Sequence, residues 1–455
     1  MSGADAPRRG PGAPLGRSAV VRVDPERPDS GVLGRAGRLI REGRLVAFPT
    51  ETVYGLGANA LDDDAVRRIY AVKGRAASDP LIVHLAGVEA LREVTASSGD
   101  GPRSSAHTTH TTNKGIRRES ERGGTLHSKD APFEEIVRLL AAHFWPGPLT
   151  LVLPKSDRIP DSVTAGLGTV AVRVPRHPVA QGLLRAAGVP IAAPSANTFT
   201  RTSATSAAHV VEDLGPGVDL ILDGGPTPIG IESTVVQVVG NIVRLLRPGA
   251  VAVEAIDRAL AKGGWTPVMV LRSAASGSGR TPADGTAGAD TPLPQPTSSP
   301  GMLEKHYAPR ARLLFFSGPP DAARAALRAA TVEALVHGQR VGLLLCHEDI
   351  TSFSNLTTHA AARHPTSEDA SGRNSPIAGS PVPDGARVAS SLLLEDLGPV
   401  DDLALVGQRL FAAMRRLDAL GVDTICARSL PTAGLGLAID DRLTRAAGGH
   451  VVHVR

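Results

Sequence analysis

The stretch PTETVYGLG occupies residues 49–57, directly after a short apolar run at 44–49 that predicts a strand. Asp62 follows it as a candidate helix N-cap, and the acidic residues after Asp62 favour a helix through about residue 72. Hydroxyl side chains and glycines at such a strand-to-helix junction can present backbone N–H groups and hydroxyls to an anion. A tight turn without a ligand would use the same residues, so this stretch alone leaves both interpretations open.

Around this stretch the chain alternates apolar strands with helices. Further strands are predicted at 81–85, 149–153, 170–174, 190–193, 220–222, 234–239 and 242–246, and helices at 32–41 and 179–187. The Gly240-Asn241 pair between the last two strands indicates a hairpin. The C-terminal half repeats the mixture, with strands at 313–316, 341–346 and near 424–427 and helices at 321–337 and 406–420. The pattern predicts α/β or α+β sheets in two domains.

Composition excludes several classes of protein. The chain has 455 residues but only two cysteines, Cys346 and Cys426, which excludes a disulfide-rich scaffold and a cysteine-based zinc site. The net charge of +4 is too small over this length to argue for nucleic-acid binding. The longest apolar runs fall far short of the ~20 residues that span a bilayer, so we expect no membrane segment.

Four stretches are too polar or too rich in small residues to build a core, at 1–29, 97–131, 273–300 and 355–388. We therefore predict a disordered tail at 1–29, a first domain at 30–265 with a disordered insertion at 97–131, and a linker at 266–310. A second domain follows at 311–455, with a disordered insertion at 355–388. The Arg- and Ala-rich start could be a weak organelle-targeting signal, but a disordered cytosolic tail is the favoured interpretation.

The candidate chemical groups are hydroxyls, amides and cations placed near strand ends. Lys73-Gly74-Arg75 ends a predicted helix and suits either the helix dipole or a phosphate clamp. His84 lies in an apolar strand, where a core histidine is the simpler interpretation, and Arg173 lies among Val and Pro and needs a partner if it is buried. No Ser–His–Asp set, metal-ligand cluster or Walker loop occurs. This set of groups suits phosphoryl or nucleotidyl transfer without a covalent intermediate.

Taken in order, the motifs PTETVYGLG, KGR, PLIVH, FWPGPLT, TVAVRVP, PSAN, IESTVV and LRPG resemble the YrdC-like family of threonylcarbamoyl-AMP synthases. The later SPGM at 299–302 and HYAP at 306–309 resemble its longer, two-domain form. The resemblance covers about 30–265 and 299–310 in detail, and 311–455 only by architecture. It implies a twisted open mixed sheet curled around a basic cavity, followed by a smaller C-terminal Rossmann-like α/β domain.

The resemblance also implies a reaction. Such a nucleotidyltransferase converts L-threonine, bicarbonate and ATP, with Mg²⁺, into L-threonylcarbamoyladenylate and pyrophosphate. A separate tRNA threonylcarbamoyl transferase then uses the product to modify tRNA, in the cytoplasm or the mitochondrion. Contact with tRNA or double-stranded RNA is a further implication, and a regulatory RNA-binding protein of the same fold without full synthase activity is the alternative. A larger carbamoyl-transfer enzyme is disfavoured, because zinc-binding cysteines are lacking.

Site residues follow from the resemblance motif by motif. Those implied for L-threonine are Thr52, His84, Arg173, Ala193 and Ser233. Those implied for ATP are Arg75, Asp79, Thr169, Ser195, Asn197, Ser203, Arg247 and Tyr307. Lys73 and Arg75 would be catalytic, no residue is implied as a metal ligand, and Tyr307 in the 299–310 segment would close as a lid that excludes water. The sequence departs from the family pattern at Ala76 and Asp79, and a carboxylate at 79 would repel a triphosphate unless it faces Mg²⁺ or the ribose.

Overall fold

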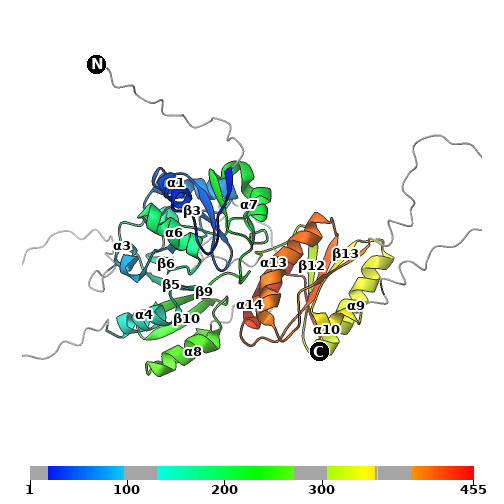
Figure 1. Cartoon of the computed structure of the whole chain (residues 1–455). Coiled ribbons are helices and arrows are strands. Elements are labelled where there is room, and N and C mark those ends of the chain that lie inside the picture. The colour runs from blue at the N-terminus through cyan, green and yellow to red at the C-terminus, as the bar shows by residue number, and fades with distance from the viewer. Residues whose placement is uncertain (1–18, 97–130, 271–304, 354–355, 357–390) are drawn as a thin grey trace, which may run out of the picture.

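The computed structural model describes residues 19–96, 131–270, 305–353, 356 and 391–455 (Figure 1). Most of the residues predicted to be disordered therefore lie outside the described residues, including all of the 97–131 insertion but residue 131 and all of the 355–388 insertion but residue 356. The described residues form two α/β units, each built on its own sheet (Figure 1). The α/β prediction is confirmed.

The first sheet contains eleven strands among the described residues and mixes parallel with antiparallel pairs. In spatial order these strands are β1 (Ala19–Arg22), β8 (Leu220–Asp223), β2 (Val46–Pro49), β3 (Tyr54–Asn59), β7 (Ile191–Ala192), β4 (Ile82–His84), β6 (Thr169–Arg173), β5 (Leu149–Pro154), β9 (Thr234–Val239), β10 (Ile242–Arg247) and β11 (Met269–Val270). Gly240 adopts a φ of 58° in the predicted hairpin between β9 and β10, a left-handed conformation that favours glycine.

Helices pack on this sheet, and those at 30–41, 63–73 and 178–187 match the predicted helices. The helices are α1 (Ser30–Arg41), α2 (Asp63–Lys73), α3 (Leu91–Val94), α4 (Ala131–Phe144), α5 (Asp161–Thr164), α6 (Pro178–Ala187), α7 (Ala207–Leu214) and α8 (Val253–Lys262). Asp62 caps α2 by accepting from Ala65 N at 3.1 Å, and Gly74 ends the helix in a left-handed conformation. A side chain on Gly37 of α1 would meet the backbone of Ala186 at 2.6 Å, so glycine there allows α1 and α6 to pack closely.

The second sheet is entirely parallel among the described residues. Its strands, in spatial order, are β14 (Leu392–Asp396), β13 (Val341–Leu345), β15 (Thr424–Arg428), β12 (Arg312–Ser317) and β16 (Val451–His453). Its helices are α9 (Pro320–Val336), α10 (His347–Ile350), α13 (Leu403–Ala419) and α14 (Gly436–Ala447). Helices α13 and α14 lie on the side that faces the first domain, and α9 and α10 lie on the other (Figure 1).

The two domains share a hydrophobic contact. Val53 and Ile231 of the first domain belong to one buried cluster with Phe411 and Met414 of α13. Gly230, with a φ of 76°, lies so close to α13 that a side chain there would meet the backbone of Gln408 at 2.6 Å. The second domain is therefore docked directly behind the loop that carries the IESTVV motif.

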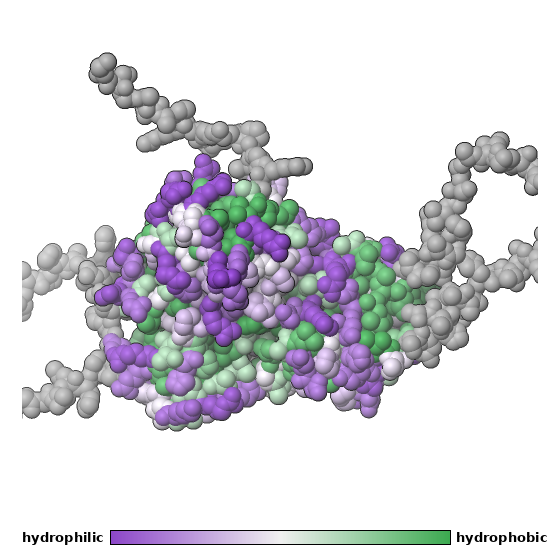
Figure 2. Space-filling model, in the orientation of Figure 1, coloured by the Kyte–Doolittle hydropathy of each residue, from purple (hydrophilic) through white to green (hydrophobic). Residues whose placement is uncertain are grey.

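The surface is mixed in character. Figure 2 shows hydrophilic residues over much of the first domain and hydrophobic residues gathered over β13 and α9 of the second, where Val332 and Val336 are exposed. Across the described ranges, no helix combines the length and the apolar character needed to cross a membrane.

Two predictions about local structure are wrong. The 49–57 stretch does not join a strand to a helix, because Tyr54–Asn59 is itself a strand that pairs antiparallel with β2. Residues 50–53 therefore form a hairpin turn, which the Thr50 hydroxyl closes by donating to Val53 O at 2.7 Å. In the predicted tail, Ala19–Arg22 pairs with β8 as an edge strand, a segment of four residues too short to stand out in a polar context.

Candidate functional site

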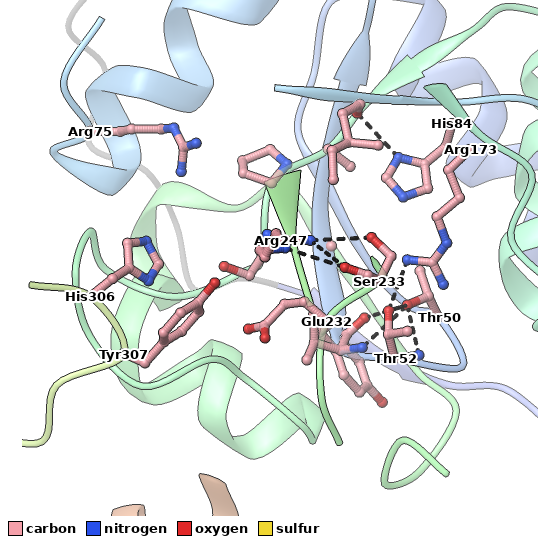
Figure 3. A pocket seen from close by; sticks show the side chains of 17 residues that line it. Thr50, Thr52, Arg75, His84, Arg173, Glu232, Ser233, Arg247, His306 and Tyr307 are labelled. Atoms are coloured by element: carbon pink, nitrogen blue, oxygen red, sulfur yellow. Dashed lines mark hydrogen bonds between the residues drawn. The ribbon is translucent and has the colours of Figure 1, made fainter. Parts of the chain in front are cut away.

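A cavity opens where the ends of several strands of the first sheet meet the segment that leads into β12 (Figure 3). Its walls come from the 50–55 hairpin, from β4, β6 and β10, from residues 193–195 after β7, from the loop before β9, and from residues 306–307. The predicted site residues among its lining are Thr52, Arg75, His84, Arg173, Ala193, Ser195, Ser233, Arg247 and Tyr307. The fold thus brings most of the separate motifs around one space, with Arg75 and Tyr307 on one side of the view and His84 and Arg173 on the other (Figure 3).

Arg173, the last residue of β6, reaches from the strand to the hairpin turn. Its Nε donates to Gly147 O at 3.2 Å, and its Nη1 donates to Thr52 Oγ1 at 2.9 Å. Its Nη2 lies 2.7 Å from Glu51 Oε1, in a pair whose two side chains are 4% and 2% exposed. The partner that a buried Arg173 requires is therefore Glu51, which we did not predict as a site residue.

Glu51 remains ionised in this position. Burial favours the neutral acid, but the charge and hydrogen bond of Arg173, with the backbone N–H of Arg176 at 3.0 Å, outweigh burial and lower the pKa of the carboxyl. The ionised carboxylate fixes the orientation of the guanidinium. The sequence carried a signal for this pair, since Glu51 lies inside the PTET motif and Arg173 lacked a partner within its own strand.

His84 lies beside Arg173 with a different charge state. Its Nδ1 lies 3.2 Å from Ile82 O, and burial, reinforced by the charge of Arg173, lowers the pKa of the imidazole to about 3. The ring is therefore neutral near pH 7 and adds a polar but uncharged wall to the cavity. It is both a buried strand residue and a cavity residue, so the two sequence interpretations do not exclude each other.

Ser233 connects the two sides of the cavity. Its hydroxyl lies 2.8 Å from Thr150 Oγ1, and Arg247 Nη2 donates to the carbonyl of Ser233 at 3.0 Å and to its hydroxyl at 3.2 Å. Burial lowers the pKa of Arg247 from its usual value. Arg75, Arg173 and Arg247 together give the cavity three guanidinium groups, which agrees with the basic cavity that the sequence predicts.

The Arg75 side chain is held by contacts with Asp79 and Pro80, which follow it in the chain. Its Nε donates to Asp79 O at 3.1 Å, its Nη2 donates to Pro80 O at 2.9 Å, and Nη2 also lies 2.9 Å from Asp79 Oδ2. The guanidinium carbon lies 5.5 Å from the ring centre of Phe199. Asp79 does not line the cavity. It pairs with Arg75 instead, which removes the electrostatic objection to an aspartate near a triphosphate.

Lys73 and Asn197 lie behind the cavity wall. Lys73 Nζ donates to the carbonyl oxygens of Ser195 and Asn197, and burial together with the charge of Arg75 lowers the pKa of its amine well below the usual value. The Asn197 side chain donates to Thr198 O at 2.8 Å and to Arg201 O at 2.9 Å. These two residues hold the PSAN loop in shape, and Ser195 is the member of the motif that reaches the cavity.

The 306–307 segment covers the remaining side. Tyr307 is 1% exposed, has a left-handed φ of 62°, and stacks on Phe411 of α13 with ring centres 5.7 Å apart. His306 packs against the Tyr307 ring, with ring centres 4.1 Å apart. Among the described residues the Tyr307 hydroxyl has no hydrogen-bond partner although it is buried. The hydroxyl is therefore available to bond a ligand in the cavity.

Two further predicted ATP residues, Thr169 and Ser203, lie outside the cavity lining, and the lining contains a carboxylate that we did not predict. Thr169 begins β6 while Arg173 ends it, a separation of roughly 13 Å at the usual rise of a strand. Ser203 is fully buried and donates its hydroxyl to Glu232 Oε1. Glu232, from the IESTVV motif, itself lines the cavity, and we did not predict it as a site residue.

Comparison with known proteins agrees with this geometry. A family model described as "Telomere recombination" matches residues 38–111 and 125–249, and one described as "Threonylcarbamoyl-AMP synthase, C-terminal domain" matches 251–448. A threonylcarbamoyl-AMP synthase from Pyrococcus abyssi is 36% identical over 429 residues, which cover 94% of this chain and 98% of that protein. The chain belongs to the threonylcarbamoyl-AMP synthase family. The resemblance to its two-domain form is confirmed.

Other relatives extend this result. The synthase from Bacillus subtilis is 36% identical over 92% of this chain and 94% of its own length. A crystal structure of Sua5 from P. abyssi, in complex with L-threonine, covers 96% of this chain and 100% of that chain with 34% sequence identity and a TM-score of 0.69. The C-terminal family model covers 251–448, so it spans the predicted linker at 266–310 together with β12, β13, β14 and β15 of the second sheet.

Proposed function

We propose that this chain is an L-threonylcarbamoyladenylate synthase, which forms threonylcarbamoyl-AMP and pyrophosphate from L-threonine, bicarbonate and ATP. The observation that carries the proposal is one cavity with two chemically different ends. One end, here the threonine end, consists of Thr52, His84, Arg173, Ala193 and Ser233. The other, the nucleotide end, consists of Arg75, Ser195, Arg247, His306 and Tyr307. Relatives over nearly the whole chain that carry the synthase name support the proposal.

At the threonine end, Arg173 would bind the carboxylate of the amino acid. Its hydrogen bonds to Gly147 O and Thr52 Oγ1 and its ion pair with Glu51 do not use all five guanidinium N–H groups, so some are left for a ligand. The neutral His84 adds no charge that would repel the α-amino group. This end therefore suits an amino acid held by its carboxylate, with its amine directed toward the middle of the cavity.

The reaction would proceed in the middle of the cavity. The threonine amine forms a C–N bond to carbon dioxide derived from bicarbonate and loses a proton. A carbamate oxygen then attacks the α-phosphorus of ATP, and the bond from that phosphorus to the bridging oxygen breaks to release pyrophosphate. Arg75 and Arg247 lie where they can stabilise the negative charge of the phosphates. Lys73 would act indirectly, by holding the carbonyl groups of the PSAN loop.

Mg²⁺ would arrive on the phosphates of ATP. Among the described residues no three histidine, cysteine or acidic side chains gather into a metal site. Glu232 is a carboxylate in the wall of the cavity, and its two oxygens are already bonded to Ser203 and Arg442. Magnesium commonly binds through substrate phosphates and water with few protein ligands, which fits this wall.

The test is pyrophosphate release from Mg-ATP and bicarbonate, with and without L-threonine. We expect release that depends on both L-threonine and bicarbonate. Release that ignores L-threonine would reduce the activity to nucleotide hydrolysis, and no release, together with binding to double-stranded RNA, would favour the RNA-binding alternative. Addition of the tRNA transferase and tRNA tests the further proposal that the product is used to modify tRNA.

A further inference from the structure

One fully buried cation connects the second domain to the cavity. Arg442, on α14, is 0% exposed and is the largest fully buried side chain in the part of the chain that the structure describes. Its Nε lies 2.7 Å from Glu232 Oε2, and its Nη2 donates to Pro248 O at 3.0 Å. These two partners come from the IESTVV and LRPG motifs of the first domain. The contacts are therefore made between domains, and they reach the loops that form the cavity.

The same guanidinium also supports the segment that covers the nucleotide end. Its carbon lies 4.8 Å from the ring centre of Tyr307, within the range of a cation–π interaction. Phe411 also stacks on this ring, so the tyrosine contacts two residues of the second domain. A single side chain thus contacts the 232 loop, the 248 loop and the Tyr307 ring.

The charges of Glu232 and Arg442 should affect how strongly a nucleotide binds. Glu232 lines the cavity and would repel the phosphates of ATP if its charge were unpaired. Arg442 supplies the matching positive charge inside a buried environment, where such interactions are strong. Burial opposes the charge of Arg442, but the neighbouring Tyr307, Glu232 and Asp441 together raise its pKa, so the guanidinium stays ionised.

We propose that Arg442 is a positioning residue for the nucleotide end of the cavity, through which docking of the second domain controls the affinity for ATP. The inference rests on the proposed function, and it deepens that function by assigning a role to the second domain. Arg442 acts through Glu232 and Tyr307 and does not line the cavity itself. The threonine end has no contact with Arg442, so its affinity for L-threonine should not depend on this residue.

The test compares three variants of the full chain with the wild type. In Arg442→Met the Michaelis constant for ATP should rise about tenfold or more, while that for L-threonine stays within about twofold. In Arg442→Met/Glu232→Gln the unpaired carboxylate is removed, and the constant for ATP should return most of the way to the wild-type value. The control is Arg428→Met, which breaks a buried pair with Asp349 (2.7 Å) inside the second domain and should leave both constants unchanged.

Several results would overturn the inference. One is a Michaelis constant for ATP that stays unchanged in Arg442→Met, or that rises no more than the constant for L-threonine. Another is the same rise in the control Arg428→Met. The last is a Michaelis constant for ATP that does not recover in Arg442→Met/Glu232→Gln. If Arg442→Met does not fold, Arg442→Lys keeps the charge but cannot bridge Glu232 and Pro248. It should raise the constant for ATP by more than about twofold, and no rise would overturn the inference.

The proposed function can fail separately. If the wild type releases no threonine-dependent pyrophosphate, calorimetric binding of Mg-ATP to the wild type and to Arg442→Met still tests the role of Arg442. About tenfold weaker binding by the variant supports that role, and equal binding contradicts it.

Discussion

The two ends of the cavity are built in different ways. At the threonine end, His84, Arg173 and Ser233 are at most 3% exposed, and the partners described for them all belong to the first domain. At the nucleotide end, Tyr307 contacts Phe411 and Arg442 of the second domain. One sheet is enough to preorganise the first end, whereas the second end is complete only when two domains are docked. Changes at the two ends should therefore affect different substrates.

The largest effect is expected at Arg75. Arg75→Met removes a cation from the nucleotide end and should lower kcat/KM for ATP about 10²–10³-fold. Because the variant leaves Asp79 without its partner guanidinium in a buried place, Arg75→Met/Asp79→Asn should recover stability without recovering activity. Steady-state kinetics and thermal unfolding separate the two effects.

The matched control lies on α2, the helix that ends just before Arg75. Arg67 pairs with Asp63 at the surface, with side chains 68% and 42% exposed, and exposed pairs of this kind contribute little. Arg67→Met should leave kcat/KM within about twofold of the wild type. An equal loss in both variants would mean that Arg75 has no special role.

The next effect is expected at the threonine end. Arg173→Met should raise the Michaelis constant for L-threonine roughly 10–100-fold and leave that for ATP nearly unchanged, because the guanidinium is anchored within the first domain. Burial of an unpaired Glu51 should also cost about 3–5 kcal/mol of stability, and Glu51→Gln in the same chain should relieve much of that cost. A parallel rise for both substrates would remove the distinction between the two ends.

The charge state of His84 gives a prediction about pH. The folded-state pKa of about 3 lies below the usual value of about 6.5, so the unfolded state takes up the proton first as the pH falls. The stability contributed by the neutral ring is complete above about pH 6.5 and is lost as the pH falls toward 3. When the pH is lowered from about 7.5 to about 5, the free energy of unfolding measured in urea should fall about 2 kcal/mol less for His84→Gln than for the wild type. Equal losses would contradict a buried neutral imidazole.

The smallest effect is expected at the Tyr307 hydroxyl. Tyr307→Phe keeps the ring in contact with Phe411 and Arg442 and removes a hydroxyl that has no partner among the described residues. Stability without ligand should change by less than about 0.5 kcal/mol, while the Michaelis constant for ATP should rise about 3–10-fold if the hydroxyl contacts the nucleotide. Loss of stability without any change for ATP would make Tyr307 a purely structural residue.

The sequence predicted most strands of the two sheets but not β1, β3, β11, β14 or β16, and it predicted nine of the residues that line the cavity. Motifs such as the 49–57 stretch and PSAN contain their functional groups within a few residues, so their order along the chain was sufficient. The partners were harder to predict, because Glu51 with Arg173 and Glu232 with Arg442 join residues that only the tertiary fold brings together. The sequence also gave no sign that Lys73 would be bonded to the backbone of the PSAN loop, 122 and 124 residues further along the chain.

The most direct measurement follows the carbon of bicarbonate. The full chain is incubated with isotopically labelled bicarbonate, Mg-ATP and L-threonine, and the adenylate product is isolated and analysed by mass spectrometry. We predict an adenylate that carries the labelled carbon and one threonine, formed only when L-threonine is present. An adenylate without the label, or the same products with L-threonine omitted, would contradict the assignment of this cavity to threonylcarbamoyl-AMP synthesis.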